Sequence, residues 1–241
     1  MLNYPPAVLM EERIARVRFH MAEAAVAAGR DPQEILLCAV SKTQTSETVR
    51  MSAGMPVDCF GENHMQELVA HHQDGAYLGK NVHFIGHLQT NKVKKVVGLA
   101  SLIQSVDSLR LLEAIEKEAG KQNLRQDILL ELNIGEESTK TGAAAEDLWP
   151  LLEAAAGMHN VRVRGLMAIP PAFDNSPESR RYFAMLRELM EQAKARHYEN
   201  AQLDVLSMGM SGSYEAAIAE GATLVRVGTA IYGQRDYPNR G

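Results

Sequence analysis

Short apolar runs recur along the chain, and a stretch with helical character follows nearly every one. The runs are four to seven residues long and are dominated by Val, Ile and Leu. Short, nearly continuous apolar runs are typical of parallel strands whose two faces are both covered. We therefore predict eight strands, at residues 35–40, 57–60, 82–85, 101–104, 128–133, 161–167, 203–207 and 223–227.

Helical patterns fill most of the intervals between these runs. A further helix is expected before the first strand, at residues 8–28, because Ala, Arg and Glu recur there and Gly29 follows as a stop signal. The other predicted helices are residues 47–51, 62–76, 89–97, 108–119, 144–156, 177–197 and 214–220.

Repeated alternation of strand and helix predicts an α/β fold of the (β/α)₈ TIM-barrel type. The length of 241 residues agrees with the roughly 250 residues of one such barrel. We expect a single domain over 1–241, with an N-terminal helix in 1–30 and the barrel in 35–235. A doubly wound open sheet is the alternative, although no Gly-x-Gly-x-x-Gly turn follows the first strand.

Charge, apolar content and cysteine positions exclude several classes of function. The formal net charge is -5, which argues against nucleic-acid binding. No apolar run approaches the roughly 20 residues of a membrane span, and acidic residues interrupt the N-terminus where a secretory signal would be apolar. Cys38 and Cys59 lie in apolar runs, so we expect buried thiols in a reducing compartment. A cytoplasmic protein without a membrane partner is the resulting expectation.

The active site of a (β/α)₈ barrel lies at the C-terminal ends of its strands, and Lys42 follows the first predicted strand closely. Side chains alternate along a strand, so Lys42 continues the face of Cys38 and Val40. If that face points inward, the amine lies at the barrel mouth. Burial and a neighbouring cation would lower its pKa and make the neutral, nucleophilic form available for a Schiff base. A solvated surface lysine is the alternative.

Arg226 stands in an otherwise apolar strand near the end of the chain. A charge there is costly unless it is paired or directed into a site. It is therefore either half of a structural ion pair or a donor to an acceptor atom on a ligand.

The loops after the last two strands have the composition of a phosphate-binding cradle. Ser207, Gly209 and Ser211 follow strand seven, whereas Gly228 and Thr229 precede a short helical start. Barrels often bind phosphate between these loops, where helix N–H groups favour an anion. Ordinary N-capping by Ser211 or Thr229 explains the same residues. With Lys42 and Arg226, the set predicts a phosphorylated carbonyl ligand.

At this point a family resemblance emerges. Residues 38–43 (Cys-Ala-Val-Ser-Lys-Thr) resemble the cofactor-lysine segment of the pyridoxal phosphate homeostasis protein family. Six further segments resemble the same family in order, and the match spans about residues 36 to 235. They are residues 60–63 with 66–67, 83–86 with 88–89 and 91–92, 105–107, 165–170, 206–211 and 225–233.

The resemblance implies a barrel like the N-terminal domain of alanine racemase. It also implies pyridoxal 5′-phosphate (PLP) as a Schiff base on Lys42, with Arg226 near the pyridine nitrogen. Phosphate contacts are implied for Ser207, Ser211, Gly228 and Thr229. Asn63, after the second strand, completes the cofactor-binding set.

The implied function is PLP and amino-acid homeostasis without robust turnover. Arginine stays protonated and cannot give a proton to the pyridine nitrogen, which leaves the ring a weaker electron sink. We therefore assign no catalytic residue, and PLP-dependent apo-enzymes are possible acceptors of the cofactor. A low-activity amino-acid racemase is the alternative, with a second base from Tyr232, His83 or a partner chain. A Schiff-base aldolase is a weaker one.

No metal site is predicted. His71 and His72 are adjacent on a polar helical stretch, and neither they nor His64 have Cys or carboxylate neighbours at ligand spacing, so we interpret them as solvated. Met208 and Met210 are interpreted as packing residues. We expect no second domain and therefore a monomer.

Overall fold

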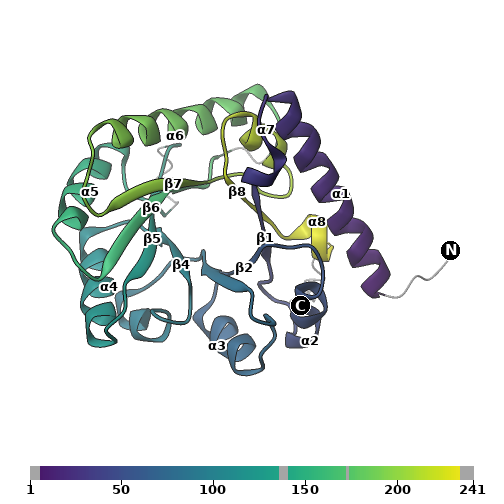
Figure 1. The fold of residues 1–241 in the computed structure, drawn as a ribbon, viewed down its shortest axis with the longest axis horizontal. Helices are drawn as coiled ribbons and strands as arrows, with labels where there is room; N and C mark the ends of the chain where they lie inside the picture. Colours follow the sequence, from purple (N-terminus) through teal and green to yellow (C-terminus); the bar gives the residue numbers. More distant parts are fainter. Residues whose placement is uncertain (1–5, 136–140, 172–173, 234–241) are drawn as a thin grey trace, which may run out of the picture.

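The computed structural model of this chain describes residues 6–135, 141–171 and 174–233. Its parallel strands form a closed barrel in the order of the sequence (Figure 1). The predicted barrel is confirmed, and the open-sheet alternative is wrong because the first and last strands pair. The strands are β1 (Leu36–Val40), β2 (Cys59–Glu62), β3 (Asn81–Phe84), β4 (Leu102–Val106), β5 (Gln126–Leu132), β6 (Val161–Ala168), β7 (Ala201–Ser207) and β8 (Leu224–Val227).

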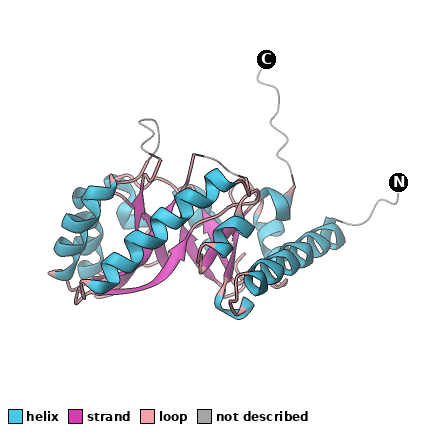
Figure 2. Cartoon of the chain, turned by 90° about the horizontal axis from the view of Figure 1, so that it is seen from above, coloured by secondary structure: helices cyan, strands magenta, loops and turns pink. Residues whose placement is uncertain are grey.

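Helices surround the strands on the outside of the barrel (Figure 2). They are α1 (Pro6–Ala27), α2 (Ser46–Ala53), α3 (Met65–Gln73), α4 (Leu109–Lys121), α5 (Leu148–Ala156), α6 (Pro177–Ala195), α7 (Tyr214–Ala219) and α8 (Thr229–Tyr232), with 3₁₀ turns η1 (Pro32–Glu34), η2 (Thr90–Lys95) and η3 (Ala145–Asp147). None of the helices in the described ranges combines the length and the apolar character that crossing a bilayer requires.

Two elements differ from the sequence prediction. Within the predicted helix over 89–97, residues 90–95 form the 3₁₀ turn η2 instead. The buried Val93 and Val96 are three residues apart, which is the period of a 3₁₀ helix. The helix predicted from residue 62 begins at Met65, because Glu62 is the last residue of β2 and pairs with Phe84 of β3.

The predicted domain extents stay a prediction. Residues 1–5 of the expected N-terminal segment and residues 234–235 of the expected barrel segment lie outside the described residues. Gly29 does follow α1, and its φ of 70° is a conformation that glycine adopts without strain.

The barrel interior changes from apolar to polar toward the C-terminal ends of the strands. Leu102, Leu129 and Met167 form one small interior cluster, and Cys38, Cys59 and Leu224 form another, with Val205 packed against both. Several of these residues are followed two positions later by a buried polar residue, which shares their strand face. The polar residues are Gln104, Glu131, Ser207 and Arg226. The sequence thus places a polar layer beneath the barrel mouth.

Helix α1 supports the side of the barrel where β7 and β8 end. It lies against α7 and α8 (Figure 1). Arg30, just beyond α1, donates through Nη1 to the carbonyl oxygens of Ile218 (2.9 Å) and Ala222 (2.8 Å) at the end of α7. These bonds tie Arg30 to the last turn of α7 and to the loop after it. The extra helix therefore holds the two short helices that follow the predicted phosphate loops.

Gly165 lies where β6 approaches β7 closely. A Cβ on Gly165, whose φ is 150°, would lie 1.8 Å from the carbonyl oxygen of Val205 in β7. Because backbone cannot yield as a side chain does, we expect Gly165→Ala to lower the free energy of unfolding by at least about 2 kcal/mol. Urea unfolding measures the change.

The matched control is Gly157→Ala at the C-cap of α5, where φ is -86° and the nearest atom to a Cβ is 3.7 Å away. This variant should stay within about 0.5 kcal/mol of the parent chain. Equal stability of both variants would contradict the close strand approach.

Candidate functional site

A cavity of about 270 Å³ opens at the C-terminal ends of the strands. Its volume is near the lower end of ligand pockets, which begin at about 300 Å³. Six of the seven predicted cofactor-binding residues line it: Lys42, Asn63, Ser211, Arg226, Gly228 and Thr229. The other lining residues are Val40, Ile85, Ile169, Met210 and Gly212. Residues that are far apart in the sequence thus meet at the predicted end of the barrel.

The face of β1 agrees with the strand alternation predicted for Lys42. Cys38 belongs to an interior cluster, whereas Val40 and Lys42 line the cavity above it. Strand β1 pairs with β8, and Cys38 is in register with Arg226. The amine of Lys42 and the guanidinium of Arg226 therefore enter one cavity from neighbouring strands.

The loop that carries Lys42 is anchored on both sides of that residue. The Ser41 hydroxyl donates to Glu62 Oε1 at 2.5 Å, and the Thr43 N–H donates to Glu67 Oε1 at 2.8 Å. Thr43 has a φ of 66°, a conformation that is uncommon outside glycine and needs support from its surroundings. The side chains of β2 and α3 supply that support and fix the direction in which Lys42 leaves the strand.

Glu62 is the centre of a buried polar network under this loop. Its Oε1 accepts from Ser41, from His71 Nδ1 at 2.9 Å and from the Tyr77 hydroxyl at 3.2 Å. His71 Nε2 lies 3.1 Å from the carbonyl oxygen of Gln44, which can only accept. Both ring nitrogens therefore donate, and the ring is an imidazolium beside a carboxylate.

The prediction that His71 is solvated is wrong. Its side chain is buried, whereas the neighbouring His72 is exposed. The hydrogen bond to Glu62 raises the pKa of His71, against the opposing effect of burial. A signal was present in the sequence, because Met65, Leu68 and His71 recur at intervals of three on one face of α3.

Arg226 lies at the bottom of the cavity and is almost completely buried, with 3% of its surface exposed. Its Nη1 donates to Ser207 Oγ at 2.5 Å, and its Nη2 donates to the carbonyl oxygen of Ala168 at 3.0 Å. No acidic side chain forms an ion pair with it among the described residues. Burial lowers the pKa of Arg226 to about 10, so the group stays charged at neutral pH.

Ser207 is the predicted residue that does not line the cavity. It is fully buried, and it accepts from Arg226 while donating to Gln104 Oε1 at 2.6 Å. In this structure Ser207 and Gln104 hold the guanidinium from below. Sequence reasoning missed Gln104, although its position two residues after Leu102 places it on the interior face of β4.

Ser211 occupies the expected phosphate cradle. Its hydroxyl oxygen accepts from the N–H groups of Gly228 (3.1 Å) and Ala230 (3.3 Å) at the start of α8. Ser211 thus satisfies N–H groups at the start of α8 from a different loop, whereas the N-cap residue of that helix is Gly228. A negatively charged oxygen could accept from the same N–H groups, because their present acceptor Ser211 and the neighbouring Gly228 and Thr229 line the cavity.

The chemistry of the lining fits a flat, anionic heterocycle. Val40, Ile85, Ile169 and Met210 supply apolar walls, while the cations supply charge. Asn63 Oδ1 is buried and has no hydrogen-bond partner within the described ranges, which leaves an acceptor for a ligand donor. Of the two methionines interpreted as packing residues, Met208 is buried in the core and Met210 faces the cavity.

The two residues considered as a second base do not line the cavity. The hydroxyl of Tyr232 lies 3.0 Å from Ser52 Oγ, and burial raises its pKa above the usual range. His83 is buried in the barrel interior, where its Nδ1 accepts from Gln104 Nε2 at 2.9 Å. Neither has contact with the space in which a ligand would react.

Comparisons with known proteins agree with this geometry. The family described as "Alanine racemase, N-terminal domain" matches residues 20–236. The chain is 43% identical over 226 residues to the pyridoxal phosphate homeostasis protein of Aquifex aeolicus, covering 94% of this chain and 98% of that protein. PipY of Synechococcus elongatus, solved with PLP bound, superposes with a TM-score of 0.81 at 31% identity, covering 93% of this chain and all of that one. Alanine racemase of Clostridium difficile matches at a TM-score of 0.71 and 16% identity, with 92% of this chain and 57% of that chain covered, which shows the shared fold.

The buried imidazolium predicts a pH dependence of stability. The folded pKa of His71 is raised above its ordinary 6.5, so its stabilisation is complete below that value and is lost as pH rises through the folded pKa. We expect the stability difference between the parent chain and His71→Gln to be larger at about pH 5.5 than at about pH 9. Urea unfolding at both pH values measures it.

The exposed neighbour provides the control. His72→Gln should change stability little, and equally at both pH values. If His71→Gln lowers stability by the same amount at both pH values, the charged pair between His71 and Glu62 is contradicted.

Proposed function

This chain belongs to the pyridoxal phosphate homeostasis protein family, and on that premise we propose that its cavity holds PLP as a Schiff base on Lys42. The observation that carries the proposal is the meeting of Lys42 and Arg226, from adjacent strands β1 and β8, in one cavity with apolar walls. Bound PLP supplies an electrophilic aldehyde carbon and an electron-withdrawing ring.

Each lining group has a role that its position supports. The anchored loop of residues 41–45 presents the Lys42 amine, and Arg226 donates to the pyridine nitrogen. Ser211, Gly228 and Thr229 bind the phosphate, and Asn63 contributes an amide to the ring substituents. Ser207 acts as a positioning residue that fixes the guanidinium, instead of the direct phosphate contact expected from the sequence.

We propose that the protein keeps and releases the cofactor without robust turnover. A protonated guanidinium at the pyridine nitrogen cannot transfer a proton to the ring, which limits stabilisation of a carbanion. Tyr232 and His83 stand outside the cavity lining, so the two in-chain residues considered for a second acid or base do not reach the ligand. The physiological role is PLP and amino-acid homeostasis, with PLP-dependent apo-enzymes as acceptors, by a cytoplasmic monomer.

Lys42→Ala tests the covalent attachment. The purified chain, loaded with PLP, should absorb visible light, and borohydride should fix the added mass on the peptide that contains residue 42. Lys42→Ala should lose the visible band and the fixed mass, because no other amine replaces Lys42 at the end of β1. Absorbance spectra and peptide mass mapping provide the measurement, with circular dichroism to establish folding.

Lys92→Ala is the matched control, because Lys92 lines a neighbouring cavity that shares Asn63 with this one. It should keep both the visible band and the mass at residue 42. A fixed mass at Lys92, or an unchanged band in Lys42→Ala, would refute the proposed attachment.

Exchange of the α-hydrogen of amino acids in heavy water separates a carrier from a racemase. A positioned acid or base contributes about 10²- to 10⁴-fold to such a proton transfer. We expect the rate at which the loaded protein replaces the α-hydrogen by deuterium to lie within about tenfold of the rate with free PLP at the same concentration. Proton NMR measures the loss of the α-proton signal. Exchange about 100-fold faster than free PLP, accompanied by racemisation, would replace the carrier function with the racemase alternative.

A further inference from the structure

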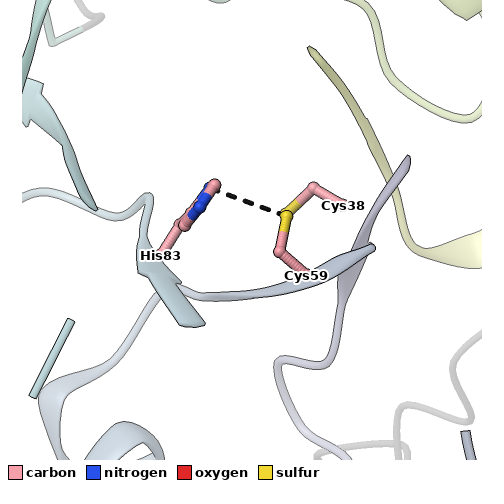
Figure 3. Close-up of side chains that lie close together, drawn as sticks. All are labelled: Cys38, Cys59 and His83. Carbon is pink, nitrogen blue, oxygen red and sulfur yellow. Dashed lines mark hydrogen bonds between the residues drawn. The ribbon is translucent and has the colours of Figure 1, made fainter. Parts of the chain in front are cut away.

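Two thiols and an imidazole meet inside the barrel, below the cavity (Figure 3). Cys38 comes from β1, Cys59 from β2 and His83 from β3, and all three side chains are buried. Their potential ligand atoms lie within 4.8 Å of one another, and Cys59 Sγ is 3.7 Å from His83 Nδ1. The fold therefore brings together the residue types that bind soft metal ions.

The hydrogen bonds around His83 fix which of its nitrogens carries a lone pair. The Arg226 guanidinium can only donate, so Ser207 Oγ accepts from it and directs its own proton to Gln104 Oε1. The amide nitrogen of Gln104 must then face His83, where it donates to Nδ1. His83 Nδ1 is thus unprotonated, which is the state that a metal ligand requires.

The pairing geometry opposes a disulfide as the purpose of the two cysteines. Cys38 and Cys59 are in-register partners on adjacent parallel strands. Such strands lie about 4.8 Å apart and their side chains stand roughly perpendicular to the sheet. A disulfide needs Cβ atoms about 3.5–4.5 Å apart. Both cysteines are free thiols in this structure, and a bridging ion would not require the strands to move closer.

Charge in the barrel interior favours a particular class of ion. Arg226 is a buried cation without an acidic ion-pair partner in the described part of the chain. Cys38 is in register with Arg226, so a charge on the sulfurs would lie near the guanidinium. A monovalent ion on two thiolates leaves one negative charge, which would neutralise Arg226. A divalent ion would leave none.

We propose that Cys38 Sγ, Cys59 Sγ and His83 Nδ1 form a three-coordinate site for a soft monovalent metal ion of the Cu(I) class. With metal–sulfur and metal–nitrogen bonds of about 2.3 and 2.0 Å, a trigonal ion separates sulfur from nitrogen by about 3.7 Å. The Cys59–His83 distance already has this value. Zn²⁺ takes four ligands, so on these three side chains it would also need a water molecule, because no other His, Cys, Asp or Glu of the described ranges joins the group.

Binding involves no change of oxidation state. The ion arrives as Cu(I), the two sulfurs form bonds to it as thiolates, and the protons that the thiols carry pass to solvent. The Gln104 amide gives up its hydrogen bond to Nδ1, which becomes the third ligand atom. Entry is from the cavity, because Cys38 lies two residues before Val40 on the same strand face. None of the three ligands is a proposed PLP contact, so the experiment measures the binding of the metal ion directly.

An anaerobic competition with the chromophoric Cu(I) chelator bathocuproine disulfonate tests the site on the full-length chain. We expect one equivalent of Cu(I) to be withdrawn from the chelator. Cys38→Ser and Cys59→Ser should each weaken binding by at least about 100-fold, and His83→Gln by about 10- to 100-fold. His72→Gln, which removes an exposed imidazole, should bind like the parent chain. Circular dichroism verifies that each variant is folded.

X-ray absorption spectroscopy of the Cu(I)-loaded parent chain tests the ligand set without any substitution. It should show two sulfur neighbours at about 2.3 Å and one nitrogen at about 2.0 Å. Three results overturn the proposal: no withdrawal of Cu(I) from the chelator, equal affinity in the cysteine variants, or a neighbour shell without two sulfurs. A two-dalton mass loss under hydrogen peroxide, in a chain that takes up no Cu(I), would assign the pair to disulfide chemistry instead.

Discussion

The pairing of β1 with β8 is the constraint on which the site depends. It closes the sheet, and it places Cys38 opposite Arg226, so the strand that leads to Lys42 runs beside the strand that carries the guanidinium. Closure also removes the two exposed strand edges that an open sheet would have. The ends of the sequence that carry the ligand chemistry, residues 40–42 and 226–229, become neighbours only because the barrel closes.

Closure has an electrostatic consequence, because it buries a permanent cation. Arg226 has no acidic ion-pair partner in the described residues, and its donors go to a hydroxyl and a backbone carbonyl instead. A buried charge that is incompletely neutralised favours any anionic or electron-rich group that approaches. The ring nitrogen of the proposed cofactor and the sulfur atoms of Cys38 and Cys59 would be such groups. One interior charge therefore links the proposed cofactor site with the proposed metal site.

Much of this arrangement followed from the sequence by local rules. Strand periodicity predicted the face shared by Cys38 and Val40, and an arginine in an apolar strand indicated a polar position in the core. What escaped prediction depends on contacts between elements. The sequence predicted Glu62 as the start of a helix, whereas its pairing with β3 makes it the last residue of β2. The sequence predicted a solvated His71, whereas a hydrogen bond to Glu62 holds its ring in the interior. Each of these residues gains its environment from the other, and a single sequence shows neither contact.

The capped phosphate cradle bears on how a carrier could release its ligand. N–H groups at a helix start that are left without acceptors would oppose the departure of a bound phosphate, because orphaned donors cost free energy. Here Ser211 Oγ accepts from the N–H groups of Gly228 and Ala230, so both are satisfied when no anion is present. An anion that accepted from these N–H groups would replace the Ser211 contacts, so the number of their hydrogen bonds would change little. Such a cradle would suit reversible binding better than permanent retention, and the proposed covalent bond to Lys42 would then be the main determinant of how long the cofactor stays.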